Sequence, residues 1–322
     1  MDDLTLRYYD AEMRYLLEAG EEFARAHPEQ AAMLNLDKAG ARDPYVERLF
    51  EGFAFLMGRL REKLDDDLPE LTEGLVSLLW PQYLRTIPSM SVVEFTPDWR
   101  EMKEKMRIVK GFEVNSQPIG EKGTRCRYTT TKEITLQPLS LEHARLSTDP
   151  DGRSVINLRF NCSHLADWSR ADLSQIPFYF NADAPLASAM HEAFTMNTAR
   201  LWLRMPGDTD RKPLDGYFTA LGFGDDDGLW PKDSSSFSGY QLLLEYFTFR
   251  DKFMFVHFNG LDGITPPAGT EYFDIEVVFS TPWPSDLPVT DDAVRLHCVP
   301  VINLFTLEAD PLTITGLESE YL

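Results

Sequence analysis

Apolar side chains within residues 1–88 recur at the three- and four-residue spacing of amphipathic helices. This spacing predicts a first helix over residues 5–27, a short second helix over 29–36 and a polar loop over 37–42. The apolar face of the first helix consists of Leu6, Tyr9, Met13, Leu16, Leu17 and Phe23. The chain therefore begins with a predicted helical region.

The strongest helical pattern begins at Asp43-Pro44, where an N-cap carboxylate precedes a proline at the first helical position. Apolar residues then repeat at helical spacing at Val46, Leu49, Phe50, Phe53, Leu56, Met57, Leu60 and Leu64. We interpret the stripe of Phe50, Phe53 and Phe55 as buried core, and a groove for a partner helix is the alternative.

The stretch from residue 65 to residue 95 changes from helical spacing to strand spacing. Three acids at 65–67 precede Pro69, and we interpret them as the first turn of a helix, where the helix dipole favours negative charge. The apolar face of this helix holds Leu71, Leu75, Leu78 and Leu79. Pro81 is predicted to end the helix, and Pro88 favours the extended backbone of a first strand.

Short runs rich in β-branched and aromatic residues follow, separated by Gly, Pro, Asn and Asp. The expected strands span residues 91–96, 108–114, 125–130, 133–138, 154–161, 176–181, 198–204, 253–258 and 271–280. A short helix is expected over 184–194 and a strand–loop element over 294–307, whereas residues 241–247 fit either a helix or a strand. This spacing predicts a sandwich-like β domain.

These patterns together predict an α+β protein in three parts. Residues 1–88 form the N-terminal helical region, and residues 89–287 form the β-rich middle domain. Residues 288–322 are expected to start a further, β-containing C-terminal domain that is truncated at Leu322.

The charge of the chain narrows the classes of partner. The net charge is −21, which argues against a nucleic-acid binder and against docking on an anionic membrane surface. Cys126, Cys162 and Cys298 are far apart and odd in number, which favours the reducing cytoplasm. No signal peptide is apparent at Met1, and no apolar run is long enough to insert into a bilayer.

Motifs that carry enzyme chemistry are missing from the sequence. There is no phosphate-binding GxxxxGK[ST] loop and no GxSxG elbow. His191-Glu192 does not begin an HExxH zinc helix, because position 195 is Thr and not His. Cys162 and His164 are two residues apart, which is a weak signal for a nucleophile or a metal. Asp225–Asp227 resemble part of a calcium loop, but position 236 is Ser instead of the required Glu. We interpret this segment as a solvated turn, and we predict no catalytic, cofactor-binding or metal-binding residues.

One aromatic cluster has two interpretations. It consists of Tyr246, Phe247, Phe249, Phe253, Phe255 and Phe258. We interpret it as a packed β core, and a partner-binding patch is the alternative.

Several short blocks resemble TssF, a baseplate subunit of the bacterial type VI secretion system, and they occur in the family's order. They include Tyr8-Tyr9-Asp10, Ala26-His27-Pro28, Asp43-Pro44-Tyr45-Val46-Glu47-Arg48-Leu49, Glu51-Gly52-Phe53, Leu64-Asp65-Asp66-Asp67, Pro69-Glu70-Leu71-Thr72, Ile87-Pro88-Ser89-Met90, Cys126-Arg127-Tyr128, Glu245-Tyr246-Phe247, Val301-Ile302-Asn303-Leu304-Phe305 and Glu320-Tyr321. The resemblance spans essentially the whole chain, although TssF proteins are commonly longer. We therefore expect this chain to be the N-terminal part of such a subunit.

The resemblance implies a structural protein without catalytic residues. TssF-like subunits build the wedges of a cytoplasmic baseplate that docks to an inner-membrane complex. Two copies are expected to join one TssG through a helical core bundle, with TssK, TssE and the VgrG hub as further partners. The baseplate supports tail tube and sheath assembly, and its rearrangement triggers contraction.

Two alternatives to this interpretation differ in class. The chain fits a wedge protein of a phage tail or of another contractile injection device. A cytoplasmic carboxylate-dependent hydrolase is a further alternative, because the chain has many acids and counting them does not exclude a catalytic pair.

Overall fold

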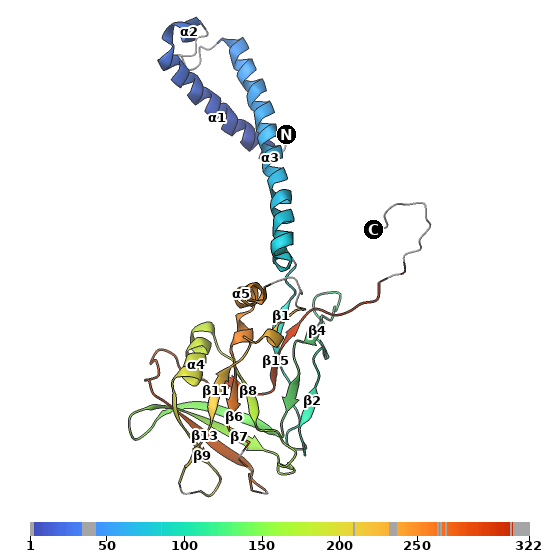
Figure 1. The fold of residues 1–322 in the computed structure, drawn as a ribbon, viewed down its shortest axis with the longest axis vertical. Helices are drawn as coiled ribbons and strands as arrows, with labels where there is room; N and C mark the ends of the chain where they lie inside the picture. The colour runs from blue at the N-terminus through green and yellow to red at the C-terminus, as the bar shows by residue number, and fades with distance from the viewer. Residues whose placement is uncertain are drawn as a thin grey trace. The chain divides into compact units, whose positions relative to one another are not determined.

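The structure is a computed structural model that describes residues 3–33, 43–84, 86–208, 210–231, 237–262, 264, 266–267, 269–309 and 311. The chain divides into two compact units, unit 1 (Met1–Arg85) and unit 2 (Thr86–Leu322). Unit 1 is helical and unit 2 contains the antiparallel sheets (Figure 1). This arrangement confirms the α+β class.

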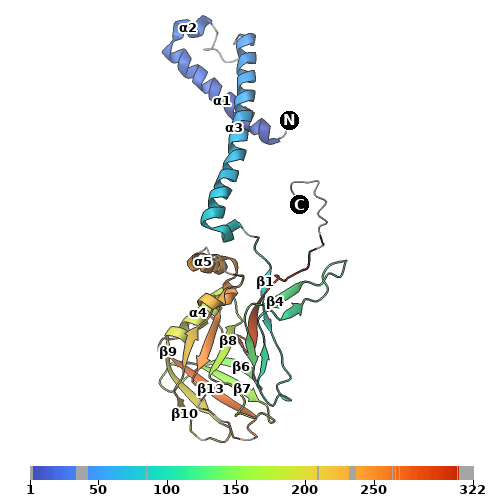
Figure 2. The ribbon, with the colours of Figure 1, turned by 45° about the vertical axis from the view of Figure 1, so that its right-hand side comes forward.

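Unit 1 is a pair of antiparallel helices with two short additions. It contains α1 (Asp3–Ala26), α2 (Pro28–Met33), α3 (Pro44–Leu79) and the 3₁₀ turn η1 (Pro81–Leu84). Both views show α1 beside the first part of α3 (Figures 1 and 2). Their polar side chains also meet, because Thr5 Oγ1 lies 3.1 Å from Glu62 Oε1 and Arg61 Nη1 lies 2.9 Å from Glu12 Oε1. The predicted helix over 5–27 is confirmed.

Small residues allow α1 and α3 to approach closely. The buried residues of α3 are Ala54 and Gly58. A Cβ atom on Gly58 would lie 3.1 Å from the backbone nitrogen of Tyr9, which is tighter than ordinary van der Waals contact. The absence of a side chain at Gly58 therefore sets how closely the two backbones pack.

The start and end of α3 agree with the prediction from the sequence, but the predicted break inside it is not observed. The Asp43 side chain accepts a hydrogen bond from Tyr45 N at 2.9 Å, and the helix ends before Pro81, as predicted. However, α3 continues through Pro69, so the interpretation of the acids at 65–67 as a helix start is wrong. A helix already nucleated upstream extends by adding one residue at a time. Proline removes one intrahelical hydrogen bond there, and the segment is exposed to water.

The interpretation of the aromatic stripe on α3 as buried core is wrong for Phe53, which is 53% exposed. Phe50 and Phe55 are half-buried, and Phe50 lies beside Gly20 of α1. The physical reason is that α1 covers the side of α3 marked by Ala54 and Gly58 and leaves other sides uncovered.

Two sheets of unit 2 pack face to face. The five-stranded sheet has the order β10 (Lys212–Leu214), β9 (Thr198–Arg204), β13 (Tyr272–Phe279), β7 (Ser154–Cys162), β6 (Leu139–Thr148). The four-stranded sheet has the order β11 (Tyr217–Ala220), β12 (Phe255–Asn259), β8 (Gln175–Phe180), β14 (Val294–Arg295). Helix α4 (Ala184–Met196) contacts strands of both sheets (Figure 2).

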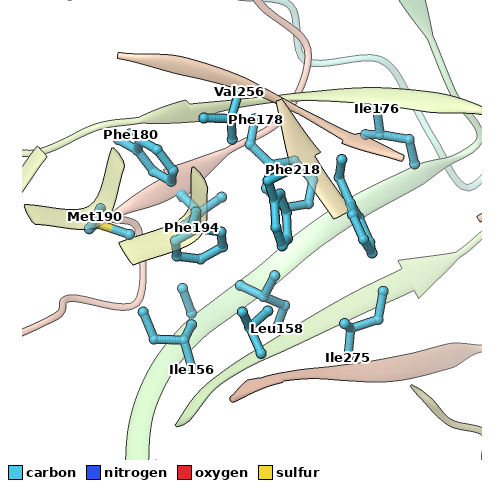
Figure 3. Packing of buried hydrophobic residues seen from close by; sticks show 14 of the residues in the cluster. Ile156, Leu158, Ile176, Phe178, Phe180, Met190, Phe194, Phe218, Val256 and Ile275 are labelled. Carbon is cyan, nitrogen blue, oxygen red and sulfur yellow. The ribbon is translucent and has the colours of Figure 1, made fainter. Parts of the chain in front are cut away.

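The core between these sheets is rich in phenylalanine. Ile156, Leu158 and Ile275 lie on one side and Phe178 and Phe218 on the other (Figure 3). Met190 and Phe194 from α4 join the same cluster. Apolar residues alternate with polar ones along β7, as expected for a strand with one face buried.

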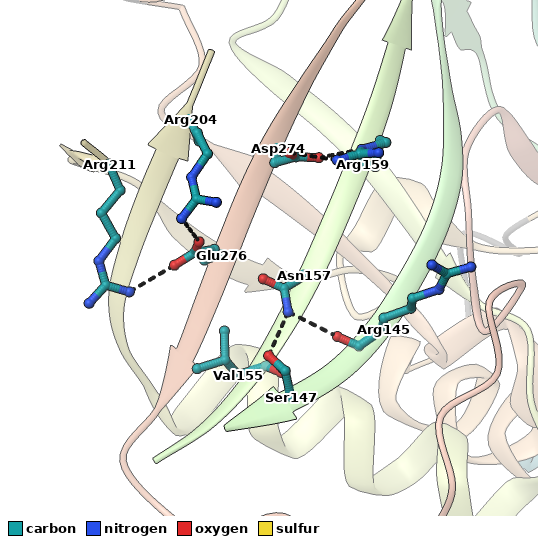
Figure 4. A network of polar contacts seen from close by, with 9 residues as sticks. All are labelled: Arg145, Ser147, Val155, Asn157, Arg159, Arg204, Arg211, Asp274 and Glu276. Atoms are coloured by element: carbon teal, nitrogen blue, oxygen red, sulfur yellow. Dashed lines mark hydrogen bonds and ion pairs between the residues drawn. The ribbon is translucent and has the colours of Figure 1, made fainter. Parts of the chain in front are cut away.

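The outward face of the five-stranded sheet carries cross-strand ion pairs (Figure 4). Arg159 donates two hydrogen bonds to Asp274, at 2.7 and 3.0 Å. Glu276 accepts from Arg204 at 3.0 Å and from Arg211 at 2.8 Å. This face is therefore polar, and the sheet buries only its other face.

A smaller sheet and a strand pair form a second core. The sheet has the order β1 (Met90–Glu94), β15 (Cys298–Ile302), β4 (Arg127–Thr130), β3 (Glu113–Asn115). Strands β2 (Met106–Ile108) and β5 (Ile134–Leu136) pair with each other. The second core contains Ile108, Ile134, Leu136, Val299 and Val301.

Several predictions about unit 2 are confirmed and others need correction. The helix over 184–194 and the strands near 154, 176, 198, 255 and 272 are present. The single strand expected over 108–114 is wrong, because a turn at Gly111, with φ +82°, separates β2 from β3. Residues 241–247 lie in a helix, α5 (Ser238–Thr248). Strand β6 was not predicted.

The three-part division of the chain stays a prediction. Strands β14 and β15 supply the β structure expected within residues 288–322, and they pair with β8 and β1 of unit 2. The predicted second helix is observed as α2, and its remaining residues and the loop over 37–42 lie outside the described residues. Among the described helices, none combines the length and hydropathy that a membrane crossing needs.

His297 connects the two cores through an unusual backbone conformation. It has φ +56° and is 7% exposed. Its Nε2 accepts a hydrogen bond from Gln137 N at 3.0 Å, which requires a neutral ring with the proton on Nδ1. Burial lowers the pKa of His297 from 6.5 to about 4.

Substitution at two glycines of α3 tests the helix crossing. Gly58→Leu should lower the free energy of unfolding by about 1–3 kcal/mol, because its side chain meets the α1 backbone. Gly52→Leu is the matched control, since no atom beyond the neighbouring backbone of α3 lies within 4 Å of a Cβ there and helix propensity favours leucine by about 1 kcal/mol. Urea unfolding followed by circular dichroism at 222 nm measures both. Equal effects of the two variants would contradict the crossing.

Burial of the His297 ring should make the free energy of unfolding depend on pH. The folded chain keeps the ring neutral, whereas the unfolded chain protonates it near pH 6.5, so stability is full above pH 6.5 and is lost as the pH falls toward 4. The loss amounts to about 3 kcal/mol for the shift from 6.5 to about 4. His297→Asn, which tolerates positive φ, should remove this part of the pH dependence in urea unfolding, whereas the exposed His164→Asn should not.

Candidate interaction surface

One exposed apolar stripe runs along α3. We call it the α3 seam, and its members are three or four residues apart, as on one side of a helix. They are Leu49, Phe53, Leu56, Leu60, Leu64, Leu68, Leu71, Leu75 and Leu78. Exposure along the α3 seam ranges from 51% for Leu60 to 82% for Leu78.

The α3 seam has the properties of a surface for other helices. Scattered exposed leucines are ordinary, but a continuous row on one helix leaves a large apolar area in water. Burying one leucine side chain contributes about 1.5–3 kcal/mol. A row of this spacing fits a groove between other helices, or the seam of a helical bundle.

The sequence indicated these residues but not their exposure. The spacing predicts apolar faces on two successive helices, whereas the structure joins them in the single helix α3. A groove for a partner helix is the alternative interpretation of the stripe that contains Phe53. No sequence signal separates a face that packs inside the chain from one that packs against another molecule, because both are apolar and periodic.

A second candidate region is a cleft of about 520 Å³ beside α5 in unit 2. Its wall contains an ion pair between Glu245 of α5 and Lys252 of the 3₁₀ turn η3 (Arg250–Phe253). Both side chains are buried, at 1% and 4% exposure. Glu245 Oε1 also accepts from Leu229 N and from Gln241 Nε2, each at 2.9 Å.

These hydrogen bonds make the ion pair part of the fold. A buried carboxylate is tolerated when a cation and several donors satisfy its oxygen atoms. Glu245 and Lys252 occur in short blocks that resemble the TssF family, but no motif in the sequence predicts that they form an ion pair.

The residues that were candidates for a nucleophile or a metal site have structural roles or lie on the surface. Cys162 is buried in β7, which raises the pKa of its thiol to about 12, and His164 is exposed. Such a thiol is a poor nucleophile. Asp225–Asp227 form a 3₁₀ turn, η2, which confirms the predicted turn. Asp225 and Asp226 are exposed, and Asp227 is half-buried. In the part of the chain that the structure describes, no group of three or more His, Cys, Asp and Glu could hold a metal ion.

The aromatic cluster divides between the two interpretations. Phe253, Phe255 and Phe258 are buried, which confirms a packed core at these positions. For Phe247, which is 79% exposed, the core interpretation is wrong, because this residue lies on the outward side of helix α5. Tyr246 is 38% exposed, and its ring packs edge-on against the buried Phe253.

Comparison with known proteins identifies the family that this chain resembles. The model of the family described as "Type VI secretion system, TssF" matches residues 1–322. The type VI secretion system component TssF1 of Pseudomonas aeruginosa is 31% identical over 339 residues, covering 100% of this chain and 54% of that protein.

Two solved structures contain similar chains. One is the type VI secretion system TssK-TssF-TssG baseplate subcomplex determined by cryo-electron microscopy, with TM-score 0.76, 62% identity and coverage of 85% of this chain and 52% of that chain. The other is the baseplate complex from the type VI secretion system, with TM-score 0.58, 61% identity and coverage of 99% and 55%. The chain spans about half the length of the relatives it matches.

The buried ion pair predicts the outcome of three variants. Lys252→Met should lower the free energy of unfolding by about 3–5 kcal/mol, because it leaves Glu245 charged and uncompensated in the interior. Adding Glu245→Gln should recover part of this loss. The control Lys105→Met breaks an exposed pair with Asp172 and should cost under about 1 kcal/mol. Urea unfolding compares them, and equal losses for Lys252→Met and Lys105→Met would contradict the structural role.

Proposed function

Because this chain belongs to the TssF family of the type VI secretion system, we propose that it is a structural, non-enzymatic part of the baseplate wedge. It acts in the cytoplasm, in a baseplate docked to the inner-membrane complex. The observation that carries the proposal is the α3 seam, because an apolar row of this length is a surface for assembly with other helices.

The partner proposed for the α3 seam is TssG together with a second copy of this chain. A similar chain is part of a TssK-TssF-TssG subcomplex, which supports TssG and TssK as partners. Two copies of α3 and helices of one TssG would bury their apolar sides in a common bundle. TssE and the VgrG hub complete the proposed set of partners.

The proposed mechanism is mechanical. Unit 1 joins the wedge through the α3 seam. Unit 2 provides a rigid body, because two apolar cores and cross-strand ion pairs hold its sheets together. The wedge supports assembly of the tail tube and sheath. Rearrangement of the baseplate then triggers sheath contraction by moving whole subunits relative to one another.

A double substitution in the α3 seam tests the proposal. Leu71→Asp with Leu75→Asp should keep the chain folded, because both side chains are already exposed. Capture of co-expressed TssG should fall by roughly 100-fold or more, as two apolar contacts of about 1.5–3 kcal/mol each are lost. Affinity capture measures the loss, and native mass spectrometry of the unsubstituted complex should give two copies per TssG.

The matched control adds a charge elsewhere on the same helix. Ser77→Asp changes an exposed position outside the α3 seam, so TssG capture should be unchanged. Normal capture by the double variant, or equal losses for both variants, would contradict a docking role for the α3 seam. A wild-type chain that captures no TssG would contradict the proposed function itself.

A further inference from the structure

The α3 seam from Leu64 onward has the heptad spacing of a coiled coil. Leu64, Leu68, Leu71, Leu75 and Leu78 alternate between spacings of four and three residues, and each is more than half exposed. We call these five residues the distal seam. This alternation keeps a row of side chains facing one neighbouring helix along its whole length. The distal seam therefore fits a further helix better than an extended strand.

The part of α3 that carries the distal seam extends beyond α1. Residues 63–75 are all exposed, and both views show α3 continuing past the end of α1 (Figures 1 and 2). At that end, Tyr8 Oη donates a hydrogen bond to Asp65 Oδ2 at 2.8 Å. A helical segment without packing is marginally stable in water, because isolated helices shorter than about 12–15 residues barely form. A helix that covers the distal seam would therefore stabilise this part of α3.

The charges beside the distal seam have one sign. The sequence from Asp65 to Leu84 contains five Asp and Glu and no Lys or Arg, whereas the preceding part of α3, from Pro44 to Leu64, mixes three acidic with four basic residues. Within the heptads of the distal seam, the only charged residues at the positions flanking the apolar row are Asp65 and Asp67. Charges at these positions determine which helix a coiled coil accepts, because they face the flanking side chains of the partner.

This charge pattern disfavours two alternative occupants. Packing the same segment of a second copy against the distal seam would gather five carboxylates from each chain, with no Lys or Arg in either segment. An anionic membrane surface would also repel it, since helices that bind such surfaces carry Lys and Arg on their polar face. A helix with Lys or Arg beside its apolar row would instead pair with Asp67.

We propose that the distal seam selects its partner by charge, and that its occupant is a helix of TssG with Lys or Arg beside an apolar row. Pairing of that cation with Asp67 sets the register of the two helices. Each copy of α3 therefore meets TssG, and not the other copy, along its distal seam. The inference rests on the proposed function, because it assigns one part of the α3 seam to one member of the proposed bundle.

Reversal of one flanking charge tests the selection, because the two protein occupants predict opposite signs. Asp67→Lys should weaken the affinity for TssG by roughly tenfold at low ionic strength, and the loss should shrink at high salt. Glu73→Lys is the matched control, since it reverses an exposed charge on the side of α3 away from the distal seam. It should change the affinity by less than about threefold. Biolayer interferometry with the full chain measures both variants.

Two results of this comparison would overturn the inference. If a second copy were the occupant, Asp67→Lys would relieve repulsion, so self-association of the chain would increase. Equal effects of Asp67→Lys and Glu73→Lys on the affinity for TssG would show that the flanking charge does not select the partner.

Hydrogen exchange of the unsubstituted chain tests the contact without a variant. Backbone amides of residues 71–79 should exchange at least about tenfold more slowly in the complex with TssG than in the chain alone. Amides of β7, in the core of unit 2, should exchange equally slowly in both. Slowing over residues 71–79 in the isolated chain as its concentration rises would identify a second copy as the occupant and would contradict the inference.

The outcomes separate this inference from the proposed function. Failure of the unsubstituted chain to bind TssG would contradict the proposed function and the inference with it. Normal binding of TssG together with unchanged exchange over residues 71–79, or with no loss for Asp67→Lys, would contradict the inference alone.

Discussion

The fold of unit 2 depends on the pairing of its first strand with its last. Strands β1 and β15 are antiparallel, with the register running from Met90 opposite Ile302 to Glu94 opposite Cys298. Strand β14 joins the four-stranded sheet only a few residues before β15 joins the smaller one. The short connection at His297 therefore ties the two cores together, which is why its left-handed backbone and buried ring matter to the whole unit.

The two units differ in which side chains they bury and which they expose. Unit 2 pairs its buried charge internally, as at Glu245 and Lys252, and uses ion pairs across the water-facing side of a sheet. Unit 1 buries small residues at the crossing of α1 and α3 and leaves its large apolar residues outside. Unit 2 packs its own cores, whereas helical unit 1 leaves an apolar side uncovered. This combination suits a subunit of a larger assembly.

Local signals in the sequence predicted the helices and strands better than they predicted which faces of those elements are buried. The Asp43 cap and the alternation along β7 and β13 have short-range causes, so they could be predicted. Strand β6 was missed because a register shift between Leu141 and His143 interrupts its alternation. Helix α3 continues through Pro69 because helical turns already precede that residue. The exposure of the α3 seam depends on which other elements pack against α3, and its own sequence does not contain that information. The cleft beside α5 combines distant segments without a motif, so no local pattern in the sequence could predict it.

If the α3 seam is the docking surface proposed above, it also links the lifetime of the subunit to the supply of its partners. A partner that binds only the folded chain stabilises it by mass action, so an unassembled copy is less protected than an assembled one. Unassembled copies expose a row of leucines to chaperones and proteases, and small differences in stability change abundance several-fold in cells. Degradation of surplus copies would then balance the numbers of different subunits without a dedicated regulator. The leucines that are proposed to join the wedge would thereby keep its components in proportion.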